Sequence, residues 1–242
     1  DSGSIIFTWW DGVDNTTYEV DIINISTRKV SVLYDLAALG VMSRDGKYLV
    51  FRSLAGDLCV YDTAKYSLKV INSGDQAYGY IAISPDNTNI ITTMYTKDND
   101  ERLFSIPLLG GTPVQLTFHS GEHWYPEFSP DGKWVLYTNW DPATTTSQIQ
   151  ALELSTGTSK YIWDTAIDAY CPSFATGGKR FAYLMYNEDN RGYDLYAADF
   201  PYAATLAAPK VLSPNGGEQW PQGPSQLLSR QRPSNAKAEY SL

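Results

Sequence analysis

A short turn motif recurs four times along the chain and limits the folds that the sequence can adopt. Its copies occupy residues 42–47 (MSRDGK), 83–87 (ISPDN), 128–133 (FSPDGK) and 174–179 (FATGGK). With Ser43, Ser84, Ser129 and Ala175 taken as equivalent, the copies are 41, 45 and 46 residues apart. Proline presets φ at the first turn position, Asp accepts hydrogen bonds from the turn, and Gly takes a positive φ. The motif therefore predicts tight hairpins at the period of a four-stranded propeller blade.

Each turn is followed by three strand-like segments. An apolar segment comes first, then one of alternating polarity, then a short closing one. The apolar segments are 48–51, 90–94, 134–137 and 181–184, the alternating ones 58–62, 103–106, 149–153 and 195–199, and the closing ones 68–71, 113–116, 159–162 and 210–212. With the strand before the turn, each unit has strands A to D, counted from the inside of the ring outwards. The sequence predicts an all-β propeller of about five four-stranded blade units, with almost no helix.

The first blade unit differs from the others because it lacks its inner strand. Residues 5–8, 18–23 and 29–33 supply strands B, C and D, and no strand A precedes them. We expect blade units at about 1–36, 37–77, 78–123, 124–169 and 170–213, then a linker or truncated module over 214–242. A vacant inner position exposes unpaired backbone groups. Two alternatives fill it: a larger assembly of which this chain is a fragment or subunit, or residues 226–229 of the tail.

The unit from residue 125 resembles the TolB-like, WD40-like β-propeller repeat, also called PD40, whose hallmark is an F-S-P-D-G-K turn followed by an apolar strand. Residues 128–137 carry that pattern, and the resemblance extends over residues 1–213. It implies a periplasmic or extracellular propeller that binds other macromolecules, or the propeller part of a peptidase or polysaccharide lyase. Residues 213–223 resemble the start of Ig-like modules of secreted bacterial proteins, without the usual continuation.

Composition narrows the range of partners. The chain has 18 Lys and Arg against 27 Asp and Glu, a net charge of −9, which repels phosphate backbones and argues against nucleic acid. No run of 18 apolar residues occurs, so no membrane insertion is expected. Aromatic residues make up 14% of the chain, which favours strands and amphipathic binding surfaces. Cys59 and Cys171 fall on strands of different blades, so we expect two buried, unpaired thiols.

Acidic and aromatic residues recur in the loops between strands B and C, which emerge on one face of a propeller together with the loops between blades. These loops are 10–15, 96–101, 140–142 and 186–193. They indicate a surface for a cationic partner, for a glycan stacked on aromatic rings, or for Ca²⁺. The alternative is that Asp and Asn only satisfy turns, and no loop has the spacing of a calcium loop. The candidate ligand-binding residues are Trp124, Trp140, Asp141, Tyr186, Asp189, Tyr193, Asp98 and Asp100.

The two histidines, His119 and His123, are predicted to share the loop that precedes Trp124. Glu122 is the only nearby third ligand, so His119, Glu122 and His123 form a candidate metal site. The alternative is a solvated loop. The resemblance implies several His ligands in propeller lyases that degrade pectate, and two are too few to match.

The chain shows no convincing set of catalytic residues. No G-x-S-x-G motif occurs, so peptidase chemistry of that class is not expected. We therefore predict a non-catalytic binding or scaffold propeller that mediates protein–protein interaction, without a cofactor unless Ca²⁺ binds. The alternatives are a glycan-binding module, a propeller-type polysaccharide lyase, or a structural element of a larger assembly.

Overall fold

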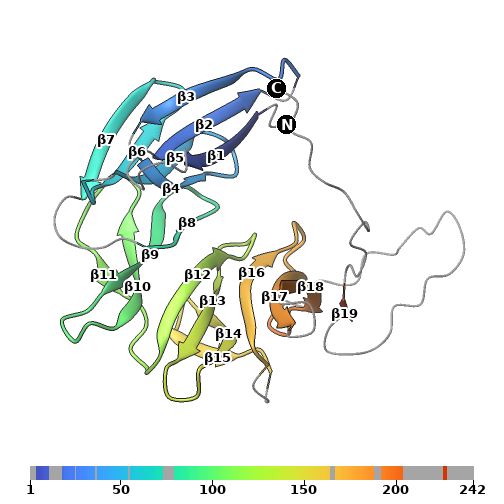
Figure 1. Cartoon of the computed structure of the whole chain (residues 1–242). Helices are drawn as coiled ribbons and strands as arrows, with labels where there is room; N and C mark the ends of the chain where they lie inside the picture. Colours follow the sequence, from blue (N-terminus) through green and yellow to red (C-terminus); the bar gives the residue numbers. More distant parts are fainter. Residues whose placement is uncertain are drawn as a thin grey trace, which may run out of the picture.

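The fold is an open succession of five antiparallel sheets in the computed structural model of the chain (Figure 1). The structure describes residues 4–10, 18–24, 26–35, 37–53, 55–72, 79–163, 167–187, 192–203 and 226–227. These residues contain strands and turns and no helix, so they include no helix able to span a membrane. The predicted all-β propeller architecture is confirmed.

Five sheets follow one another in chain order. The first is β1 (Ser4–Trp10), β2 (Tyr18–Asn24) and β3 (Val30–Asp35), and the second is β4 (Ala37–Met42), β5 (Tyr48–Ser53), β6 (Leu58–Asp62) and β7 (Ser67–Asn72). The third is β8 (Ile81–Ile83), β9 (Asn89–Tyr95), β10 (Glu101–Pro107) and β11 (Val114–Gln115). The fourth is β12 (Glu122–Phe128), β13 (Trp134–Asp141), β14 (Thr146–Glu153) and β15 (Thr158–Tyr161). The fifth is β16 (Ala169–Phe174), β17 (Arg180–Asn187), β18 (Gly192–Asp199) and β19 (Gln226–Leu227).

The inner strands β4, β8, β12 and β16 contact one another in that order, and β1 contacts β4. In Figure 1 the sheets fan around an arc, with the first and fifth at its two ends. Within the described residues β1 pairs with β2 alone, so the first sheet has three strands and lacks an inner one, as the sequence predicts.

The recurrent turn has the predicted hydrogen bonds. In the fourth sheet the Ser129 hydroxyl donates to Asp131 Oδ1 (2.6 Å), and Gly132 has φ +70°. The Trp134 N–H donates to Ser129 Oγ (3.0 Å), which fixes the start of β13. The same Ser-to-Asp bond occurs at Ser43 (2.8 Å) and Ser84 (2.6 Å). These three hairpins are therefore held by their own side chains, whereas the fourth copy of the turn has Ala175 in place of the serine.

The core lies between the sheets. Each of the three larger clusters of buried apolar side chains combines residues from two neighbouring sheets, in the order second with third, third with fourth, and fourth with fifth. A central strand is therefore covered on both faces, and every residue from 134 to 139 in β13 is buried. This explains the continuous apolar runs that follow the turns.

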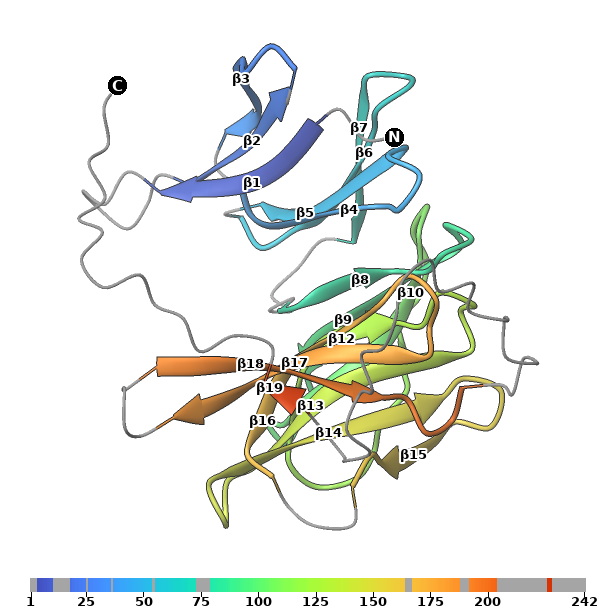
Figure 2. The same cartoon turned by 90° about the vertical axis from the view of Figure 1, so that its right-hand side faces the viewer.

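The tail joins the outer edge of the fifth sheet. Gln226 pairs with Ala197 and Leu227 with Tyr196, which places β19 beside β18 (Figure 2). Of the two alternatives for the vacant inner position, closure of the first sheet by residues 226–229 is wrong, because Gln226 and Leu227 pair with β18 and not with β1. The predicted closing strand 210–212 and the Ig-like segment 213–223 lie outside the described residues.

Three inner strands share a β-bulge. The register shifts between Ala38 and Val41 in β4, between Trp124 and Glu127 in β12, and between Tyr170 and Ser173 in β16. Tyr125 (φ +53°) and Cys171 (φ +51°) occupy equivalent bulged positions in the left-handed region. Both cysteines are unpaired, but only Cys59 is buried, whereas Cys171, at a bulged position, is half-buried.

Candidate binding face

Two tryptophans of the fourth sheet stack on each other. In β12 the side chains alternate, so that Trp124 and Glu122 share one side of the strand and the fully buried His123 takes the other. Trp140 of β13 lies opposite Glu122 and therefore diagonal to Trp124. The two indole rings are 5.5 Å apart between centroids and 14° from parallel. Strand alternation and cross-strand register together build this aromatic pair.

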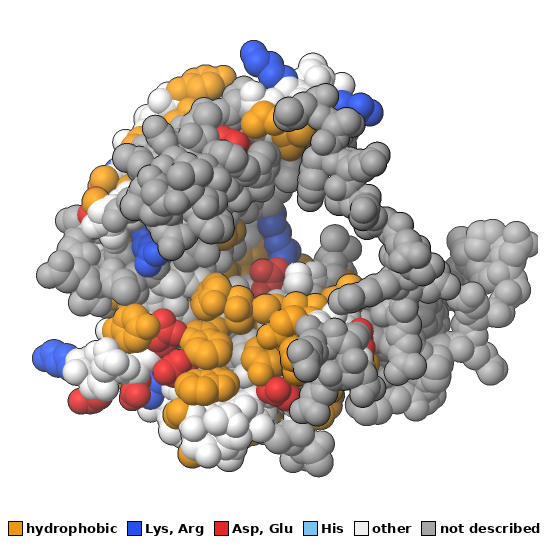
Figure 3. All heavy atoms as spheres, in the orientation of Figure 1, with side chains coloured by type: hydrophobic (Ala, Val, Ile, Leu, Met, Phe, Trp, Pro, Cys, Tyr) orange, Lys and Arg blue, Asp and Glu red, His pale blue; other side chains and the backbone are white. Residues whose placement is uncertain are grey.

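Carboxylates lie beside the tryptophans. The Trp124 indole N–H donates to the Glu101 carboxylate, and Tyr95, opposite Glu101 in the third sheet, hydrogen-bonds the same group. Burial, reinforced by the negative charges of Glu101 and Asp100, raises the pKa of Glu122 above its usual range. We call Tyr95, Glu101, Glu122, Trp124 and Trp140 the acidic–aromatic face. Figure 3 shows hydrophobic and acidic side chains side by side over the lower half of the molecule.

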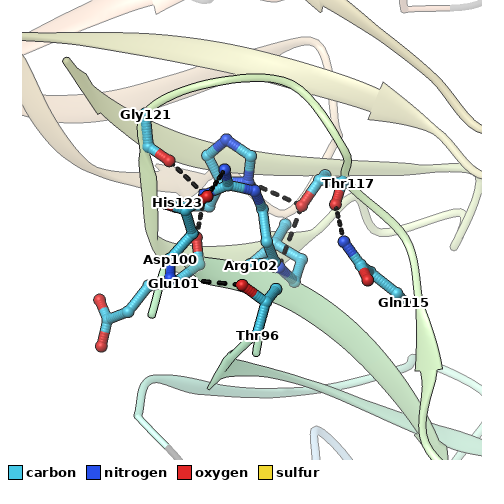
Figure 4. Close-up of polar contacts among 9 residues, drawn as sticks. Thr96, Asp100, Glu101, Arg102, Gln115, Thr117, Gly121 and His123 are labelled. Atoms are coloured by element: carbon cyan, nitrogen blue, oxygen red, sulfur yellow. Dashed lines mark hydrogen bonds and ion pairs between the residues drawn. The ribbon is translucent and has the colours of Figure 1, made fainter. Parts of the chain in front are cut away.

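Arg102 supports this face from beneath. It is 5% exposed, and its Nη1 donates to the carbonyl oxygens of Glu101 (2.9 Å) and Gly121. Its Nη2 forms an ion pair with Asp100 Oδ2 (2.8 Å; Figure 4). Gly121 has φ +100°, and a β-carbon there would lie 2.0 Å from Asn139 Oδ1. Glycine is therefore required where the loop before β12 passes β13.

The two histidines belong to a buried polar network. Thr117 Oγ1 accepts the Leu103 N–H (3.0 Å) and lies within hydrogen-bond distance of His123 Nδ1 (2.7 Å). Burial, with the nearby His119 and Arg102, lowers the pKa of His123 to about 3. The ring is therefore neutral at ordinary pH.

Tyr137 connects this network to the neighbouring strands. Its hydroxyl lies within hydrogen-bond distance of His119 Nε2 (2.9 Å), Gln150 Oε1 (2.7 Å) and Ser159 Oγ (2.8 Å). Burial raises the pKa of Tyr137 far above its usual range. His119 and His123 thus serve packing between β12, β13 and β14 rather than an exposed loop.

The structure brings the two histidines together but separates Glu122 from them. His119 lies in the loop before β12 and His123 within β12, with ring centroids 4.4 Å apart. Glu122 points to the other side of the strand. Across the described part of the chain, no three His, Cys, Asp or Glu side chains come together in a way that could hold a metal ion.

A second aromatic group lies on the fifth sheet. Tyr186 and Tyr193 are cross-strand partners with ring centroids 5.5 Å apart, and both are exposed. Tyr170 of β16 meets Tyr193 edge to face at 5.8 Å. Asp189, predicted to join this group, lies outside the described residues.

The other predicted acidic residues do not converge with the tryptophans. Asp98 is exposed in the turn between β9 and β10, and Asp100 is paired with Arg102. Asp141 accepts the Ala143 N–H (2.9 Å), which is the turn-forming role considered as an alternative. The sequence prediction did not select Tyr95, Glu101 or Arg102. Because side chains alternate along a strand, the sequence could have placed Glu122 on the same side of the strand as Trp124. Glu101 belongs to another blade, so alternation along one strand could not place it beside Trp124.

Comparisons with known proteins agree on the fold. No family model matches the chain. The solved structure of TolB from Acinetobacter baumannii has a TM-score of 0.68 at 16% identity over 82% of this chain, and this chain spans only about half of that protein (50%). An oligogalacturonate lyase in complex with manganese gives 0.50 at 11% identity, covering 82% of this chain and 71% of the lyase. A curated uncharacterized protein of Agrobacterium fabrum is 21% identical over 224 residues, 70% of this chain and 74% of the relative. The chain therefore has a TolB-like propeller fold.

Proposed function

We propose that this chain is a non-catalytic binding propeller that holds a protein partner on its acidic–aromatic face, in the periplasm or outside the cell. The observation that carries the proposal is the stacked pair of Trp124 and Trp140 with the carboxylates of Glu101 and Glu122 beside it. The location rests on the resemblance of the repeat to TolB-like propellers.

The chemistry of the face favours a basic partner. Tryptophan is enriched among the residues that contribute most to protein interfaces, because a large flat ring buries apolar area at low entropic cost. Arg102 beneath the face forms its ion pair with Asp100 (2.8 Å), which leaves Glu101 and Glu122 to give this face its acidic character. A Lys or Arg side chain over the indole rings would gain both ion pairing and cation–π attraction. The net charge of −9 would speed the approach of such a partner.

The environment of His123 argues against a catalytic role for this histidine. A general base needs access to substrate and a pKa near the working pH. His123 is fully buried, its Nδ1 is occupied by Thr117, and its pKa is about 3.

The test is capture of partners from an envelope fraction of the source organism by the immobilised chain, followed by titration of the recovered partner. Trp140→Ala and Glu101→Gln are compared with Tyr66→Ala, which removes an 82% exposed ring near the outer strand β7. We expect Trp140→Ala to weaken binding about tenfold or more, Glu101→Gln to reduce its salt dependence, and Tyr66→Ala to change neither. The proposal would be overturned if the partner bound Trp140→Ala and Glu101→Gln as tightly as it binds the parent chain.

A glycan ligand is the second candidate, favoured by the exposed pair of Tyr186 and Tyr193. Sugar rings pack their apolar faces on aromatic side chains without needing positive charge. Hits on a glycan array that disappear in Trp140→Ala or Tyr193→Ala would replace the protein partner by a glycan. Turnover of polyuronates that is abolished by His123→Ala would instead identify a lyase.

A further inference from the structure

An open cavity of about 410 Å³ lies among the inner strands, separate from the acidic–aromatic face. It is lined by residues of the second to fifth sheets: Gly40, Val41, Tyr80, Ile81, Tyr125, Pro126, Cys171 and Pro172. Trp124 of the face directly precedes Tyr125, so the cavity begins one residue along β12 from the face. A volume of this size is typical of small-molecule sites.

Two strained positions build one side of the cavity. Tyr125 and Cys171 both have φ near +50°, which is unfavourable for residues with a β-carbon, and each is followed by a proline. The Cys171 N–H donates to Thr138 Oγ1 (3.2 Å), which holds the second bulge in place. Strained backbone of this kind clusters where side chains are positioned for ligands. Here the bulges bring both side chains to the cavity.

The lining is uncharged and offers few polar atoms. Val41, Ile81, Pro126 and Pro172 supply apolar walls. The Tyr80 hydroxyl donates to the Tyr125 hydroxyl (3.0 Å), and Tyr125 also hydrogen-bonds Cys171. After these bonds the Tyr80 hydroxyl oxygen still has a lone pair that can accept a hydrogen bond from a ligand. The neighbouring Glu127 is paired with Arg44 (3.9 Å), so it adds no unmatched charge.

We propose that this cavity binds a small neutral molecule with an apolar ring and one hydroxyl group, of the phenol class. The ring would fill the apolar walls and its hydroxyl would donate to Tyr80. A charged ligand would lose its hydration without an opposite charge among the lining residues. A sugar would bring more hydroxyl groups than the lining can satisfy. This site does not depend on the proposed protein partner.

The first test is titration of the full chain with p-cresol, followed by saturation-transfer NMR. We expect saturable binding with a dissociation constant at or below about 1 mM, and none with benzoate or glucose. Val41→Trp fills the cavity and should abolish binding, and Tyr80→Phe should weaken it about three- to tenfold by removing the acceptor. Tyr66→Ala, far out on the second sheet, should bind as the parent does. Should Val41→Trp fail to fold, Tyr80→Phe decides alone.

The second test places the ligand through the two thiols. Cys171 lines the cavity, whereas Cys59 is buried elsewhere and is an internal control. We expect iodoacetamide to modify Cys171 faster than Cys59, and p-cresol to slow the modification of Cys171 alone. The absence of saturable binding, equal binding of benzoate, undiminished binding in Tyr80→Phe, or a Cys171 as unreactive as Cys59 would each overturn the proposal.

Discussion

Gly178 faces Pro130 of the preceding blade so closely that a β-carbon added at Gly178 would lie 3.2 Å from Pro130 Cδ. The relationship repeats one blade earlier, where a β-carbon on Gly132 would lie 3.6 Å from Pro85 Cδ. The proline of one turn thus packs against the glycine of the next. The turn motif shapes its own hairpin and also sets the contact between successive blades.

Alanine at Gly178 should be destabilising. Gly178 has φ +67°, and the new methyl group would press on the Pro130 ring, so we expect Gly178→Ala to lower the free energy of unfolding by about 1–2 kcal/mol. The matched control is Gly177→Ala, where a β-carbon meets nothing within 4 Å. Urea unfolding monitored by tryptophan fluorescence measures both. Equal losses in the two variants would contradict the turn-to-turn contact.

Loss of Arg102 should cost far more than loss of its ion-pair partner. Arg102→Gln leaves the carbonyl oxygens of Glu101 and Gly121 without their donor, and we expect it to lower the free energy of unfolding by about 2–4 kcal/mol. Asp100 is 52% exposed in its side chain, so Asp100→Asn should cost less than about 1 kcal/mol. Urea titrations of both variants measure the difference. Similar costs would show that the ion pair, and not the support of the loop, is what matters.

Acid should destabilise the protein through His123 before most carboxylates titrate. The unfolded ring takes up a proton as pH falls through about 6.5, whereas the folded ring stays neutral down to about 3. The unfolded state therefore binds more protons between these values, and the free energy of unfolding falls by up to about 1.4 kcal/mol per pH unit. Burial also lowers the pKa of His119, so this residue adds to the loss of stability in acid.

The matched variant for this prediction is His123→Gln, which has no proton to bind. Its stability should depend less on pH between about 6 and 4.5 than that of the parent chain. The carboxylates of Asp45, Asp86 and Asp131, whose pKa values are lowered by hydrogen bonds in their turns, contribute mainly below that window. Urea unfolding at a series of pH values gives both curves, and parallel curves would contradict a buried neutral His123.

The Tyr137 hydroxyl should stabilise the junction of β12, β13 and β14. Tyr137→Phe removes a buried hydroxyl that lies close to His119, Gln150 and Ser159, so we expect a cost of about 1–3 kcal/mol. Tyr66→Phe changes an exposed ring and should stay within about 0.5 kcal/mol of the parent chain. Thermal unfolding checks both, and a neutral Tyr137→Phe would show that water replaces the hydroxyl.

Much of the fold is readable in the sequence because its signals are local. The turn from Ser129 to Lys133 holds itself by short-range hydrogen bonds, and the apolar runs after each turn mark strands buried on both faces. Strand order and the missing inner strand of the first sheet follow from counting these units. The aromatic residues Trp124 and Trp140 are also identifiable, because loop composition and the blade period place them on one end of the propeller.

Only the tertiary structure decided how the units meet. Glu101 reaches Trp124 from the neighbouring blade, and Arg102 reaches the loop of Gly121 nineteen residues away, contacts that no spacing rule contains. The same holds for the tail, because its sequence does not specify the strand with which Gln226 and Leu227 pair, and in the structure they pair with β18. Local turn chemistry and alternation fix each blade. The partners of its outward-facing side chains depend on the rotation between blades, which the sequence pattern does not specify.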